Sequence, residues 1–160
     1  MAKLTIRHYR RGDIAYLVEQ MVTIIPSLPH YKGIQVSKPR LTYLLEQNMN
    51  PQSGFAAWVL TDNEDTPQGG VAAYCAPALF STDLVANDVF LYIDPAHRSL
   101  VNVDLLISTY VQWARSRVAK LIKATETAGE VVVNKKQAAF DKLLARHKFQ
   151  RIGSMYYVVD

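Results

Sequence analysis

The sequence is poor in cysteine and has no long hydrophobic run. Cys75 is the only cysteine, so no disulfide can form within the chain, and a lone thiol is typical of a reducing compartment. No apolar run approaches the ~20 residues that a membrane-spanning helix needs. The first residues, MAKLTIRHYRR, lack the apolar core of a signal peptide. The sequence therefore predicts a cytoplasmic protein without a membrane segment.

Signals for metal and nucleic-acid binding are also missing. His97 and His147 have no partners at metal-ligand spacing, so no metal site is predicted. Basic residues gather at 7–11 and 135–151, and the net charge is +4. Such patches attract anions, namely nucleic acid, acidic protein or a phosphorylated cofactor, although a solvated surface explains either patch equally well. Interleaved aromatics and known nucleic-acid motifs are lacking, so direct nucleic-acid binding is not expected.

The composition is that of one globular domain spanning residues 1–160. Hydrophobic residues make up 49% of the 160 residues and charged residues 20%, with no repeat, low-complexity segment or linker. This length is enough for a single compact core.

Local patterns predict the order of helices and strands. Alternation at 4–10 predicts a strand, Asp13 is expected to be the N-cap of a first helix, and Ser37 with Pro39 opens a second. Strands are predicted at 55–61 and 70–76, then a long connection at 77–87, and an apolar strand at 88–94 buried on both faces. A helix at 100–117, a strand at 120–127, a helix at 134–147 and a terminal strand or strand pair complete the chain. This order implies an α/β class with a mixed sheet covered by helices.

The stretch FLYIDPAHRSLVNVDLL has the layout of a loop that grips a phosphorylated cofactor. A buried strand turns at Asp94 and Pro95, passes Arg98, and enters an amphipathic helix. Backbone N–H groups at a helix start bind phosphate, and glycine lets the backbone approach closely or adopt positive φ. This stretch contains no glycine.

The element order and two motifs resemble the GCN5-related N-acetyltransferases over nearly the whole chain. The motifs are "LYIDPAHRS…LL" and "LLARHKFQRIGSMYYV". In the family, the fourth strand ends in a pattern like L-x-V-x-P-x-x-R-G-x-G-x-G/A. The matching positions are Leu91, Ile93, Pro95, Arg98, Ser99, Val101 and Val103, so all three glycines are replaced. In the later family pattern L-Y-x-x-x-G-F, Leu144 takes the tyrosine position and Lys148 the glycine position.

This resemblance implies a mixed, mostly antiparallel sheet of about six to seven strands with about four helices on both faces. It also implies an acetyl-CoA-dependent N-acetyltransferase whose amine acceptor is an unknown protein or small molecule, and a homodimer is compatible with it. Phage-encoded members resemble this chain in their glycine-poor loop. The alternative is therefore a non-catalytic phage or prophage protein with a structural or host-interaction role.

The family resemblance also assigns the cofactor contacts. Strands 88–94 and 120–127 are expected to part and admit the pantetheine arm. The fourth-strand residues that would pair with the cofactor and polarise its carbonyl are Leu91, Tyr92 and Ile93. The residues of the loop and helix start that would hold the phosphates are Arg98, Ser99, Leu100, Val101, Asn102 and Val103. Asn134 would bond the pantetheine arm or cap the last helix.

The side chains that replace the glycines affect how the loop can bind phosphate. Ser99 can cap the helix or donate its hydroxyl to phosphate. The β-branched side chain of Val101 takes up space and resists positive φ. If residues 100–103 are already helical, their N–H groups are free first-turn donors whatever the side chains, and Val103 falls on the buried face.

Candidates for the chemistry follow from the same resemblance. Asp88 is the candidate general base and, by alternation, should share a face with Phe90 and Tyr92; a structural strand-end aspartate is the alternative. Tyr156 could supply the general acid that Leu144 cannot, although a cross-strand packing role fits it too. The loop with His30 and Tyr31 would border the acceptor.

Overall fold

The sheet has five strands in the computed structural model, which describes residues 4–27, 31, 33–50, 52–124 and 137–150. The strands lie in the order β1 (Thr5–His8), β2 (Phe55–Thr61), β3 (Pro67–Pro77), β4 (Leu84–Ile93) and β5 (Leu121–Lys123). Neighbours from β1 to β4 are antiparallel, and β5 is parallel to β4. The predicted mixed, mostly antiparallel sheet is confirmed. The described residues supply five strands, where six to seven were predicted for the whole chain. The predicted terminal strands lie outside the described residues.

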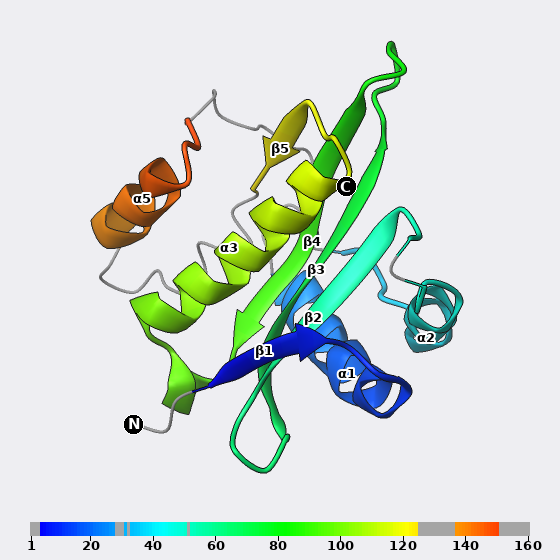
Figure 1. Ribbon diagram of the computed structural model, residues 1–160. Helices are drawn as coiled ribbons and strands as arrows, with labels where there is room; N and C mark the ends of the chain where they lie inside the picture. The colour runs from blue at the N-terminus through cyan, green and yellow to red at the C-terminus, as the bar shows by residue number, and fades with distance from the viewer. Residues whose placement is uncertain (1–3, 28–30, 32, 51, 125–136, 151–160) are drawn as a thin grey trace.

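Helices cover both faces of the sheet (Figure 1). One face carries α1 (Ile14–Ile24) and α2 (Lys38–Gln47), and the other carries α3 (Leu100–Ser116) and α5 (Gln137–Arg146). Short 3-10 turns occupy η1 (Arg11–Asp13), η2 (Ile25–Ser27) and η4 (Pro95–His97). The crossover from β4 to β5 runs through α3, as a parallel connection requires.

Each face of the sheet has its own hydrophobic core. All seven residues of β2 are buried, because the strand is central and helices cover both sides. Trp58 and Leu60 pack with α3 and α5, whereas Ala57 and Val59 pack with α1 and α2. The period of two in a strand thus divides one apolar run between two cores.

Two serine caps begin the helices that flank the sheet. Ser37 Oγ accepts a hydrogen bond from the Arg40 N–H at 3.3 Å, and Ser99 Oγ accepts one from the Asn102 N–H at 3.2 Å. Both satisfy first-turn donors that have no partner inside the helix. The predicted start of the second helix at Ser37 and Pro39 is confirmed.

Asp13 is the N-cap residue of α1, as predicted, but its side chain makes no hydrogen bond to the helix. Its carboxylate instead accepts from both terminal nitrogens of Arg7, at 2.7 and 3.1 Å, and from the Arg10 N–H at 2.6 Å. The η1 turn places Asp13 in helical backbone with its side chain directed back at β1, so the guanidinium replaces the α1 donors. The hydrogen bond to Asp13 raises the pKa of Arg7.

Replacement of Asp13 is expected to destabilise the fold. The side chains of Asp13 and Arg7 are only 7% and 19% exposed, so Asp13→Ala leaves a mostly buried cation with one carboxylate fewer. The free energy of unfolding should fall by about 2 kcal/mol, measured by urea denaturation. Glu46→Ala is the control, because Glu46 pairs with Arg11 at 3.8 Å on the surface and should cost under about 1 kcal/mol. Equal losses in the two variants would contradict the structural role of the Arg7–Asp13 pair.

The connection predicted at 77–87 is shorter in the structure, because its two ends belong to strands. β3 continues to Pro77 and β4 begins at Leu84, and the Ala78 N–H donates to the Asp83 carbonyl at 3.0 Å to close the turn. The resulting hairpin extends beyond the other strands (Figure 1). The segment 84–87 shows little apolar alternation, so its strand structure depends on pairing with β3, which the sequence pattern does not report.

Candidate active site

Among the described residues, β5 covers only the first part of the β4 edge. β5 pairs with β4 at only three positions, Val85 with Leu121, Ala86 with Ile122 and Asn87 with Lys123. Within the described part of the chain, residues 88–93 have no β5 partner. The described chain stops at residue 124 on this side, so the predicted parting of the two strands stays a prediction. A strand edge with free backbone groups can pair with an extended ligand.

A β-bulge lies just beyond the last described pair of β4 with β5. Ala72 pairs with Phe90 but Ala73 pairs with Asp88, so Val89 is an extra residue on β4. A bulge of this kind reverses the alternation of side chains beyond it. The prediction that Asp88 shares a face with Phe90 and Tyr92 is therefore wrong.

Asp88 faces α3 instead. Its cross-strand partner Ala73 belongs to the α3-side core, whereas Phe90 belongs to the core under α1 and α2. Asp88 is only 7% exposed. Burial and then the negative charge of Asp88 raise the pKa of Tyr110, which α3 places on this face.

Tyr110 links α3 to the end of β5. Its hydroxyl donates to the Lys123 carbonyl at 2.6 Å, at the last described residue pair of the two strands. From sequence alone Tyr110 is an apolar residue of the α3 face, because only the fold brings it to Lys123 and Asp88. Its raised pKa keeps it protonated at neutral pH, so it is a donor and not a base.

The glycine-free loop leads directly into a regular helix. Leu100 is the first residue of α3, Ser99 is extended, and the non-glycine residues with positive φ in the described chain are Asp65, Val118 and Lys148. The backbone at 99–103 therefore does not need glycine for its conformation. Val103 is 2% exposed in the α3-side core, as predicted, and Val101 is 76% exposed.

Two N–H groups at the start of α3 remain available. The Asn102 N–H is bonded to Ser99 Oγ and the Val103 N–H to the Ser99 carbonyl at 3.1 Å, which leaves those of Leu100 and Val101. The Asn102 side chain donates to the His97 carbonyl at 2.7 Å and so fixes the loop. Free N–H groups at the positive end of a helix form a site for an anion.

Arg98 is braced against the end of β4. Its Nε donates to the Ile93 carbonyl at 2.9 Å, and its guanidinium carbon lies 5.9 Å from the centre of the Tyr92 ring. Burial, followed by hydrogen bonding to Asp94, raises the pKa of Tyr92. Arg98 thus has a defined position two residues before the first residue of α3.

The other predicted site residues are less informative. His30, Asn134 and Tyr156 lie outside the described residues. Tyr31 is 38% exposed and its carbonyl accepts from the Ile34 N–H at 3.0 Å. Leu144 packs against the α3-side core, so this position supplies no hydroxyl.

The described residues offer neither a metal site nor a membrane-spanning helix. They contain no cluster of three or more histidine, cysteine, aspartate or glutamate side chains that could hold a metal. Among the same residues, no helix combines the length and apolarity needed to cross a membrane.

Comparison with solved structures identifies the fold. An acetyltransferase of Trypanosoma brucei matches with a TM-score of 0.65 and 15% identity over 99% of both chains. An aminoglycoside acetyltransferase from an uncultured soil metagenomic sample, in complex with sisomicin, matches with a TM-score of 0.61 and 18% identity over 98% of this chain and 97% of the other. The fold is that of the acetyltransferases.

The same fold also occurs in a protein described as a transcriptional regulator, and the sequence itself matches no known family. A transcriptional regulator from Bacillus halodurans C-125 matches with a TM-score of 0.66 and 16% identity over 99% of this chain and all of the other. The sequence matches no protein-family model and no curated protein. At these identities the likeness extends to the fold alone.

Proposed function

We propose that this chain is an acetyl-CoA-dependent N-acetyltransferase that acts on an amine of a protein or small molecule. The observation that carries the proposal is the β4 edge, unpaired with β5 beyond Asn87 in the described residues and followed by two free N–H groups at the start of α3. An extended thioester arm ending in a pyrophosphate matches this sequence of backbone donors.

The residues fit the cofactor without glycine. Helical backbone from Leu100 presents the N–H groups of Leu100 and Val101, and Arg98 adds a guanidinium beside them. The N–H groups of Leu91, Tyr92 and Ile93 would pair with the arm and polarise the thioester carbonyl. Acetyl-CoA supplies the activated acetyl group, and the chain orients it.

Proton removal from the attacking amine is assigned to Asp88. A neutral amine is the nucleophile, so the reaction needs a base near the carbonyl. Asp88 lies next to the bulge, just beyond the last described pair of β4 with β5, and it would act directly or through one water. Tyr156 stays the candidate for protonation of the leaving thiolate.

Acetyl-CoA is expected to bind with a dissociation constant in the micromolar range or weaker, which is about −8 kcal/mol or less favourable. Two free N–H groups and one arginine would hold the phosphates here, which is a small number of contacts for a pyrophosphate. Isothermal titration calorimetry with acetyl-CoA and with CoA measures this. The absence of heat and of a thermal shift at millimolar ligand would refute the proposal.

That negative result would favour the second candidate, a non-catalytic phage or prophage relative with a structural or host-interaction role. The observation in its favour is Leu144, which packs into the core where the resembling enzymes carry a tyrosine.

A further inference from the structure

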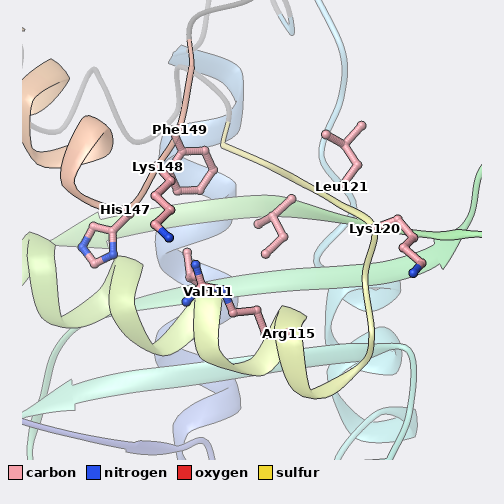
Figure 2. A pocket seen from close by; sticks show the side chains of 8 residues that line it. Val111, Arg115, Lys120, Leu121, His147, Lys148 and Phe149 are labelled. Atoms are coloured by element: carbon pink, nitrogen blue, oxygen red, sulfur yellow. The ribbon is translucent and has the colours of Figure 1, made fainter.

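A pocket of about 230 Å³ lies between α3, β5 and the segment after α5. Figure 2 shows Val111 and Arg115 on α3 beside His147, Lys148 and Phe149 of the segment after α5, whereas the side chains of Lys120 and Leu121 point away from α3. Arg115 lies fifteen residues along α3 from Leu100, which is about 22 Å at the helical rise. Arg115 is therefore remote from the free N–H groups at the start of α3, whereas His147, which bonds to Asp104 at 2.7 Å, lies nearer to them.

The pocket combines an apolar floor with unpaired cations. Val111, Leu121, Ile122 and Phe149 supply the apolar surface. His147 is paired with Asp104 at 2.7 Å. Arg115, Lys120 and Lys148 have no ion pair among the described residues, and none of the lining residues is acidic. Arg115 and Lys148 thus lie at one pocket from two different elements, and neither has an acidic partner among the described residues.

Lys148 is held in a strained backbone conformation. Its φ is 66°, in the left-handed region, and its N–H donates to the Ala145 carbonyl at 2.9 Å just after α5 ends. This position usually carries glycine, because a side chain there costs conformational energy. Glycine would relieve the strain but remove a pocket cation, and strain of this kind is retained where the side chain has a use.

We propose that this pocket is a second site, separate from the β4 edge, that binds a small phosphorylated molecule. A phosphate group would be the shared counter-ion of Arg115 and Lys148, and the ring of Phe149 with the aliphatic side chains would contact a compact organic body. The volume is below the roughly 300 Å³ of typical ligand pockets, so a phosphate with a small body fits and a whole coenzyme does not. The site does not depend on the chain being an acetyltransferase.

The test uses three probes by calorimetry: inorganic pyrophosphate, adenosine 3′,5′-bisphosphate and acetyl-CoA. Lys148→Gly is expected to raise the melting temperature, because it removes the left-handed strain, and to weaken pyrophosphate binding at least tenfold. Lys148→Arg should retain binding. Lys142→Ala, an exposed charge on α5 outside the pocket, is the matched control and should change affinity less than twofold.

Three outcomes would overturn the proposal. If no probe binds wild type at millimolar concentration, there is no anion site. If Lys148→Gly and Arg115→Gln bind pyrophosphate normally while Arg98→Ala does not, the anion occupies the start of α3. If acetyl-CoA displaces pyrophosphate competitively from wild type, the pocket belongs to the cofactor. Simultaneous binding of both supports a second site, and a protein that binds pyrophosphate but not acetyl-CoA loses only the proposed acetyltransferase function.

Discussion

Asp88→Asn is expected to lower kcat/KM for acetyl transfer by about a hundredfold or more, in the range typical for loss of a general base. Asparagine keeps the size of the side chain next to Tyr110 but cannot accept the amine proton. The assay follows CoA release from acetyl-CoA with the best acceptor of a panel of primary amines. Calorimetric affinity for acetyl-CoA should stay within threefold, because the backbone of β4 makes the proposed contacts.

A structural role for Asp88 gives a different pattern. Loss of a buried carboxylate that only packs against α3 would lower stability and leave the shape of the pH–rate profile unchanged. Loss of a base removes the acidic limb of the profile and lets the rate rise with pH as more amine is neutral. Asp83→Asn, an exposed carboxylate at the turn of the same hairpin, is the matched control and should retain full activity. Equal rates for wild type and Asp88→Asn would exclude this assignment.

Tyr110 has a positioning role near Asp88. Its hydroxyl joins α3 to the Lys123 carbonyl at the end of β5, and its charge environment includes Asp88. We infer that it positions the two elements around Asp88 and does not transfer a proton itself. The structural reason is that its hydroxyl proton is already donated to the Lys123 carbonyl at 2.6 Å.

Features set by residues close in the chain could be predicted from sequence. A serine cap acts within three residues, so the start of α3 at Ser99 followed from the sequence, as did the buried position of Val103 from helical periodicity. The helical backbone also explains why the loop tolerates valine at position 101. Once residues 100–103 are helical, the donors are backbone groups, and Val101 is largely exposed.

Features set by pairing across the fold could not be predicted. The face of Asp88 depends on the register of Ala72 and Ala73, and nothing local marks Val89 as an extra residue. The side chain of Asp13 makes no hydrogen bond to α1, because Arg7, on a neighbouring strand, binds its carboxylate. The left-handed Lys148 has no glycine signal, and only the fold shows that it lines the same pocket as Arg115.

Arg98→Ala is expected to weaken acetyl-CoA binding by about ten- to a hundredfold. The Nε of Arg98 is committed to the Ile93 carbonyl and its plane lies over Tyr92, so the guanidinium is held in place before the ligand arrives. A charge-assisted bond from such a group to a pyrophosphate is worth roughly 1.5–3 kcal/mol. Calorimetry with acetyl-CoA gives the ratio of dissociation constants.

The controls separate this anchor from general charge and from the missing glycines. Arg98→Lys should give an intermediate loss, because lysine keeps the charge but not the planar fork. Arg146→Ala, at the exposed end of α5, removes the same charge and should bind acetyl-CoA normally. Val101→Gly should change affinity less than about threefold, because the backbone there is already helical and glycine costs the helix up to about 1 kcal/mol. A large gain from Val101→Gly together with normal binding by Arg98→Ala would mean that close backbone approach, and not the arginine, limits the affinity of this loop for phosphate.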